Sequence, residues 1–325
     1  MAVPQQFEGK RRHLKPPIAK DGAGAGALMA FGAIWSAQLA GGLTVALSDG
    51  ASVEDMTWVR LVWASLILIP IVRPWRLTYN RSTILICGLL GTVSAAMMML
   101  YVMSIDRLPL GTSTALMFLG PLALAVVRAS KSGKWWAVVA ALGVVALTEP
   151  WQGGADPYGV LYALGGGLSW ALYILLSQRA GDSVGGLHVL AISFPVAAIV
   201  TTGAVGGAVV TRIPVEMIFN GFVLAILLPV LPYIMELAAL RRMTASSFGI
   251  LMSLQPAVAV VIGIVVLGQV PKPNMLAGIL LVLAAGVGAT RNGGRRAKPQ
   301  TLPTTDTEAS YQTGGIHGRE DLRKR

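Results

Sequence analysis

The sequence predicts an all-α, polytopic membrane protein whose ten transmembrane helices form two inverted five-helix repeats. Three observations support this fold class: an apolar composition, ten apolar segments of membrane-spanning length, and a sequence repeat between the two halves. Of the 325 residues, 54% are hydrophobic and 13% are charged, whereas about a quarter of the residues in a soluble domain are charged. The composition is therefore that of a protein embedded in lipid.

The apolar segments divide the chain into two tails and two repeats. Residues 1–23 form an expected cytoplasmic N-terminal tail, 24–149 the first five-helix repeat, 158–290 the second, and 291–325 an expected disordered cytoplasmic C-terminal tail. The fifth span is the weakest, because Glu149 and Pro150 cut it short. The ten expected spans are 24–47, 56–73, 83–105, 110–128, 134–149, 158–178, 186–210, 217–240, 244–268 and 273–290.

The distribution of basic residues orients these spans. With both termini in the cytoplasm, 22 of the 26 Lys and Arg residues lie on the cytoplasmic side, and only Arg107, Arg212 and Lys272 lie outside. This asymmetry follows the positive-inside rule. The first apolar segment is longer than the hydrophobic region of a signal peptide, so we interpret it as a span. The sequence thus predicts a multi-pass protein of the plasma (inner) membrane.

The two repeats share residues at a constant offset of 135. Trp35 corresponds to Trp170, Met117 to Met252, and Pro121 to Pro256. Because each repeat contains an odd number of spans, the second must enter the membrane from the opposite side. Such inverted repeats are characteristic of secondary transporters that bind their substrate between the halves.

The ninth span carries a polar residue and a helix breaker near its middle, Gln255 followed by Pro256. Proline removes a backbone donor, and lipid offers no replacement partner. A break of this kind is tolerated where the helix faces protein or a wet cavity. We therefore expect Gln255 to lie at a binding site.

Two ionisable residues lie inside spans, Arg60 in the second and Glu236 in the eighth. A charge within the bilayer costs several kcal/mol and commonly marks a functional site. One interpretation is that Arg60 extends outward to Glu54, Asp55 or Asp106 and that Glu236 meets Arg241 or Arg242 at the inner surface. The other is that Glu236 faces a cavity and binds a substrate ammonium group or a proton.

Further candidates for substrate binding are polar or aromatic residues within spans. Pro229, Tyr233 and Glu236 share one helical face, at i, i+4 and i+7. Trp35 and Trp170 are predicted either to line the cavity or to pack between the halves. The remaining candidates are Gln38, Arg60, Tyr101, Met117, Tyr173 and Gln255. The run Met97 to Met99 is interpreted as adaptable packing.

Enzyme and cofactor signatures are missing from the sequence. It contains no H-E-x-x-H, G-x-S-x-G or Walker A motif, and its three histidines are too scattered for a metal site. We expect no enzymatic activity, no cofactor, no metal and no nucleic-acid partner. The expected partners are a small-molecule substrate, protons and membrane lipid, and a homodimer is left open.

Several short stretches resemble the drug/metabolite transporter superfamily with two EamA-type repeats, most closely the bacterial inner-membrane threonine/homoserine exporters. The resemblance covers about residues 27–290 and implies proton-driven export of small hydrophilic amino acids. It also implies that Gln38, Arg60, Tyr233 and Glu236 occupy polar positions of such exporters. The stretches are Arg73-Pro74-Trp75-Arg76-Leu77, Pro109-Leu110-Gly111, Gly120-Pro121-Leu122, Trp170-Ala171, Ser177-Gln178-Arg179-Ala180-Gly181, Leu231-Pro232-Tyr233, Phe248-Gly249 and Leu251-Met252-Ser253.

The chain also departs from that pattern. Met117 and Gln255 stand where those exporters tend to have Glu, Gln269 replaces the Glu of a usual Gly-Glu ending, and Met98 replaces a polar residue. Two alternatives to amino-acid export therefore stay open. One is export of a less polar metabolite or drug-like solute, and the other is a non-transporting membrane scaffold or accessory subunit.

Overall fold

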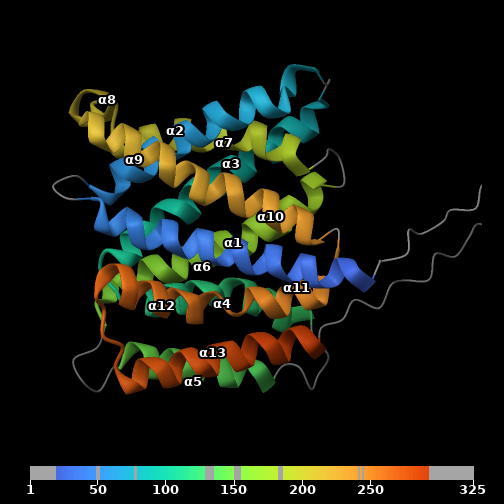
Figure 1. Ribbon diagram of the computed structural model, residues 1–325, viewed down its shortest axis with the longest axis vertical. Coiled ribbons are helices and arrows are strands. Elements are labelled where there is room, and N and C mark those ends of the chain that lie inside the picture. Colours follow the sequence, from blue (N-terminus) through green and yellow to red (C-terminus); the bar gives the residue numbers. More distant parts are fainter. Residues whose placement is uncertain are drawn as a thin grey trace, which may run out of the picture. The chain divides into compact units, whose positions relative to one another are not determined.

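A computed structural model describes residues 20–48, 52–76, 79–128, 135–149, 155–181, 186–240, 242–243 and 245–292. Within these residues every regular element is a helix (Figure 1). The all-helical fold class predicted from the sequence is confirmed. The two expected tails lie almost entirely outside the described residues. The exceptions are at their inner ends, where the first helix already begins at Lys20 and the last continues to Asn292.

The helices follow the expected spans closely. Those of the first half are α1 (Lys20–Ala46), α2 (Val53–Val72), the 3-10 turn η1 (Pro74–Arg76), α3 (Arg81–Ile105), α4 (Leu110–Arg128) and α5 (Trp135–Thr148). Those of the second half are α6 (Pro157–Gly181), α7 (Gly186–Val205), α8 (Val209–Arg212), α9 (Val215–Ala225), the π-helical η4 (Ile226–Val230), α10 (Leu231–Leu240), α11 (Ala245–Met252), α12 (Gln255–Leu267) and α13 (Pro273–Asn292).

In the described ranges, eight apolar helical segments are long enough to cross a membrane, and two apolar helices are shorter. The shorter ones are α5 and the apolar part of α13, which end each half and pack against each other. With 14 residues α5 is about 21 Å long, less than the ~30 Å of a hydrocarbon core. It ends where Glu149 takes a left-handed conformation (φ 42°), as the short fifth span predicted.

Two spans of the second half are interrupted. The eighth is broken at η4, where Leu228 is extended (φ −159°, ψ 119°) and precedes Pro229 through a cis peptide bond. The Ser36 hydroxyl of α1 donates to the Leu227 carbonyl at 2.7 Å, which supplies a partner at the break. The ninth span is broken between Met252 and Gln255, and α12 begins at the predicted Gln255-Pro256 pair.

The two halves pack reciprocally. The first helix of each half contacts the third helix of the other, as α1 with α10 and α3 with α6. Likewise, the first helix of each half contacts the fourth of the other, as α1–α12 and α6–α4, and the second contacts the third of the other, as α2–α9 and α7–α3. Equivalent helices of the two halves also meet, as α2–α7, α4–α12 and α5–α13. The start of α1 and the end of α13 lie at the same end of the bundle (Figure 1). This arrangement agrees with a duplicated five-helix unit.

The backbones of α4 and α6 approach closely where these two helices cross. A Cβ atom on Gly120 would lie 1.8 Å from the Gly167 carbonyl oxygen, and one on Gly167 would lie 2.6 Å from the Met117 carbonyl oxygen. Only glycine, which has no Cβ atom, permits this contact between the two backbones, as in other helix crossings built on small residues. The crossing holds α4 and α6 on one side of the space between the halves.

Replacing Gly120 with alanine is therefore expected to destabilise the protein by about 3 kcal/mol, because backbone cannot yield to the added methyl group. Thermal unfolding of the purified protein in detergent would measure this loss. Gly88→Ala is the control, since a Cβ there meets nothing within 4 Å, and its effect should stay within about 1 kcal/mol. Equal unfolding temperatures for the two variants would contradict the packing described here.

Candidate functional site

A cavity of about 120 Å³ lies between the two halves and is lined by helices of both. The first half contributes α1, α2, α3 and α4, and the second contributes α6, η4, α10 and α12. The interrupted eighth span and the start of α12 both face this space. Both helix breaks therefore occur next to the cavity.

Nine of the ten candidate residues from the sequence line this one cavity: Gln38, Arg60, Tyr101, Met117, Trp170, Tyr173, Tyr233, Glu236 and Gln255. Trp35 is not among the lining residues. It packs in an apolar cluster between α1, α4 and α12, edge-on to Phe31 at 6.0 Å. For Trp35 the structure thus shows packing rather than cavity lining.

Arg60 is fully buried, with 1% of its surface exposed. Its Nη1 donates to the Thr44 hydroxyl at 3.4 Å, while Nε and Nη2 have no hydrogen-bond partner among the described residues. The interpretation in which Arg60 extends to the outer surface is wrong. A side chain that reached the surface would be exposed to solvent, whereas this one is buried. Burial of a cation without a carboxylate partner costs several kcal/mol. The guanidinium at the cavity is therefore able to receive an anionic group.

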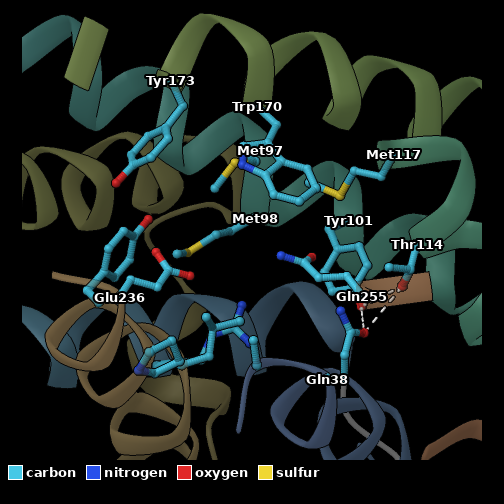
Figure 2. Close-up of a pocket in the computed structure, with 15 residues that line it drawn as sticks. Gln38, Met97, Met98, Tyr101, Thr114, Met117, Trp170, Tyr173, Glu236 and Gln255 are labelled. Atoms are coloured by element: carbon cyan, nitrogen blue, oxygen red, sulfur yellow. Dashed lines mark hydrogen bonds between the residues drawn. The ribbon is translucent and has the colours of Figure 1, made fainter. Parts of the chain in front are cut away.

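Three polar side chains that line the cavity form a hydrogen-bonded cluster (Figure 2). The Tyr101 hydroxyl donates to Gln38 Oε1 at 3.2 Å and the Thr114 hydroxyl to the same oxygen at 3.3 Å. The hydroxyl oxygens of Tyr101 and Thr114 also lie 3.2 Å apart, within hydrogen-bond distance. The cluster joins α1, α3 and α4 and holds these groups in fixed positions at the cavity.

Glu236 lies on α10, across the cavity from Gln38 in Figure 2. It is half-buried and forms no ion pair with any residue that the structure describes. Arg242, one proposed partner, instead donates to the Ala238 carbonyl at 2.9 Å, and Arg241 lies outside the described residues. The aromatic rings of Tyr173 and Tyr233 stand 6.0 Å apart beside Glu236.

Six lining residues were not candidates from the sequence: Ala37, Met97, Met98, Thr114, Leu228 and Pro232. Hydroxyl residues in apolar helices usually bond to their own backbone, so Thr114 gave no signal by type. Its position three residues before Met117 places both on one helical face. Pro232 belongs to the stretch Leu231-Pro232-Tyr233 that resembles known exporters, and it gave no separate signal of cavity lining.

Gln269 has a structural role at one end of the bundle. Its Oε1 accepts a hydrogen bond from the Leu110 N–H at 3.0 Å, so it satisfies one of the free donors at the start of α4. It does not line the cavity. The presence of glutamine rather than glutamate at this position therefore does not alter the composition of the cavity.

A second set of polar contacts ties the halves together near Leu110. Arg107 forms an ion pair with Asp156 at 3.3 Å, and its guanidinium lies 5.8 Å from the ring centres of Tyr158 and Tyr162. The backbone N–H of Gly159 hydrogen-bonds to Asp156 and, with Arg107, holds the pKa of that carboxyl below its ordinary value. These contacts join the end of α3 to the start of α6.

Comparison with known proteins adds evidence of relationship. Residues 157–290 match the EamA-like transporter family. The chain is 34% identical over 278 residues to the threonine/homoserine exporter RhtA of Escherichia coli K12, with 82% of this chain and 92% of that protein covered. It is 33% identical over 268 residues to the threonine/homoserine exporter RhtA of Salmonella typhimurium SL1344, covering 79% and 88%.

A solved structure shares the fold. This crystal structure, described only as that of a protein, has a TM-score of 0.54 and 16% sequence identity to the chain, and the match covers 82% of this chain and 98% of the other. At this identity the likeness concerns the arrangement of helices alone. The resemblance that the sequence motifs predicted is confirmed by the exporters and the family match.

Proposed function

Because this chain belongs to the EamA-like transporter family of multi-pass membrane exporters, we propose that it exports small amino acids across the inner membrane as a secondary active transporter. The relatives' names specify threonine and homoserine, and both are small zwitterions. The proposed binding site is the cavity between the halves. Its lining includes the nine candidate residues from the sequence together with Thr114, Met97 and Met98.

The observation that carries this proposal is the pair of opposite charges at one small cavity. Within the part of the chain that the structure describes, Arg60 has two buried nitrogen atoms without hydrogen-bond partners and Glu236 has no ion pair. An amino acid brings a carboxylate for the first and an ammonium group for the second. Guanidinium–carboxylate pairs are among the strongest hydrogen bonds in proteins, so the site is complementary to a zwitterion.

The charged groups of the cavity bear on the alternatives. Arg60 and Glu236 both line it, and an apolar drug-like solute would leave these groups without polar partners. A small charged metabolite suits this lining better than a drug-like solute. A scaffold without transport activity would have no use for a buried and unpaired Arg60, which lowers the stability of the fold.

We further propose that transport occurs by alternating access with proton exchange at Glu236. The reciprocal packing of the halves suits rocking about a central site. A proton bound to the Glu236 carboxylate removes its charge and so releases the ammonium group. Entry of protons would thereby drive export, with both termini in the cytoplasm as the charge distribution predicts.

Counterflow in proteoliposomes tests the proposal. Vesicles preloaded with an unlabelled amino acid should accumulate the labelled compound, and a pH gradient across the membrane should increase its net transport. Liposomes without protein are the control. If no member of a panel of the common amino acids exchanges, amino-acid transport is refuted and the scaffold becomes the better explanation.

A further inference from the structure

A cluster of charged and aromatic side chains joins the two halves at one end of the bundle. Arg107, just after α3, forms an ion pair at 3.3 Å with Asp156, just before α6. Its guanidinium also lies 5.8 Å from the ring centres of Tyr158 and Tyr162 on α6. We call these four residues the outer cluster, because the distribution of basic residues predicts that this end faces outward.

The outer cluster lies at the ends of two helices that line the cavity. α3 contributes Tyr101 to the lining and α6 contributes Trp170. The two helices belong to different halves and contact each other. Because the cavity is lined by both halves, a bound solute reaches the outside only if helices of opposite halves separate at this end. Separation of α3 from α6 there would break the ion pair.

The sequence repeat places an equivalent arginine at the opposite end of the bundle. The offset of 135 relates Arg107 to Arg242, which follows α10. It also relates Asp156 to Asp21, whose side chain lies outside the described part of the chain. Arg242 forms no ion pair with a described residue and donates instead to the Ala238 carbonyl of its own helix at 2.9 Å. Equivalent arginines are thus bonded between the halves at one end and within one helix at the other.

The helix packing beside the two arginines differs as well. A Cβ atom on Gly159 of α6 would lie 3.0 Å from the Arg107 Cβ atom. On α1 it is Gly26 that approaches the Arg242 Cβ atom to the same distance, whereas the offset of 135 makes Gly24 the counterpart of Gly159. At 1.5 Å per residue, this difference of two residues is about 3 Å along α1. The two ends of the repeat are therefore packed in different registers.

We propose that the outer cluster is a latch that closes the cavity on the outer side, and that its ion pair breaks each time the cavity opens outward. This inference rests on the proposed alternating access and identifies residues that set the balance between its states. The structure has the outer end latched, while Arg242 at the inner end is bonded to its own helix.

A latch of this kind must hold the closed state without trapping it. The side chains of Arg107 and Asp156 are 43% and 35% exposed, and an exposed ion pair shifts an equilibrium by up to about fivefold. A cation–π contact at an exposed site adds about two- to fivefold. Together these contacts favour the closed state by about 5- to 30-fold, so the open state is still visited in every cycle.

The accessibility of a thiol in the cavity tests the inference without any substrate. The chain has one cysteine, the buried Cys87, so Cys87→Ala combined with Met97→Cys carries a single reporter thiol on the cavity lining. A membrane-impermeant maleimide added to right-side-out membrane vesicles reaches this thiol when the outer end is open. The rate of labelling therefore reports the outward-open population.

Two variants of the latch are compared in this background. Asp156→Asn removes the charge but keeps an oxygen for the N–H groups of Tyr158 and Gly159, to which Asp156 Oδ1 is bonded at 2.8 and 3.1 Å, so the start of α6 is preserved. Labelling should become about two- to fivefold faster. Arg107→Met also removes both cation–π contacts, and labelling should become about 5- to 30-fold faster.

Lys272→Gln is the matched control. Lys272 pairs with Glu149 at 3.7 Å and joins the end of α5 to the start of α13, two helices that do not line the cavity. Loss of this pair should leave the labelling rate unchanged. Unchanged rates in both Asp156→Asn and Arg107→Met, at normal abundance, overturn the latch. Because labelling requires no substrate, that result is separate from the counterflow test of amino-acid export.

Discussion

Replacing Arg60 with methionine is expected to abolish amino-acid transport while making the protein more stable to heat. The buried guanidinium has one weak hydrogen bond to Thr44, and two of its nitrogen atoms find no partner among the residues described. Methionine keeps much of the aliphatic volume but removes the unsatisfied charge, which should stabilise the fold by about 1–3 kcal/mol. The substrate carboxylate meanwhile loses its partner, at a cost of about 2–5 kcal/mol.

The loss corresponds to at least about a 30-fold fall in kcat/KM. Counterflow measures the transport of this variant, and thermal unfolding in detergent measures its stability. Arg76→Met is the control, since Arg76 is an exposed basic residue at the end of η1, and it should change neither quantity appreciably. A stable Arg60→Met protein that transports at the normal rate would remove Arg60 from the binding site.

Replacing Glu236 with glutamine is expected to remove both tight binding of the ammonium group and the response of transport to pH. In the unaltered protein, protons and ammonium groups compete for one carboxylate, so the KM for substrate should fall as the pH rises. Glutamine is similar in shape but carries no charge and takes up no proton. Its KM should be at least about 30-fold higher and independent of pH.

Initial rates of counterflow at several pH values, together with accumulation driven by a pH gradient, measure these effects. Glu216→Gln provides a matched control, because Glu216 is an exposed carboxylate in the first turn of α9. That variant should retain both the affinity and the pH response of the unaltered protein. Gradient-driven accumulation that persists in Glu236→Gln would exclude Glu236 as the site of proton exchange.

The helical class and the boundaries of the helices could be predicted because both depend on local apolar content. The correspondence of Pro121 with Pro256, however, does not extend to helix geometry. α4 runs without interruption through Pro121, whereas the ninth span breaks just before Gln255. Next to Pro121, the backbone of α4 packs directly on α6 at Gly120 and Gly167. Such contacts between distant segments are not encoded in either segment alone.

Arg60 and Glu236 could be identified as candidates because a charge inside an apolar segment stands out in any sequence. Thr114, Met97 and Met98 could not, since these residue types occur throughout helix interfaces for packing reasons. What places them at the cavity is the contact of α3 and α4, in the first half, with α6, in the second half. Trp35 is the opposite case, a predicted candidate that does not line the cavity. It corresponds to Trp170 in the sequence repeat, but only Trp170 lines the cavity.

The interruption at η4 has a mechanical consequence for the helix that carries the acidic residue. α10 is ten residues long, about 15 Å, and is separated from α9 by a point where regular helical hydrogen bonding has already ceased. Tilting α10 about Leu228 would therefore break few main-chain hydrogen bonds. The hydrogen bond from Ser36 to the Leu227 carbonyl would hold the chain in place at this hinge. The Glu236 carboxylate on α10 can therefore change its distance from the opposite half at little energetic cost.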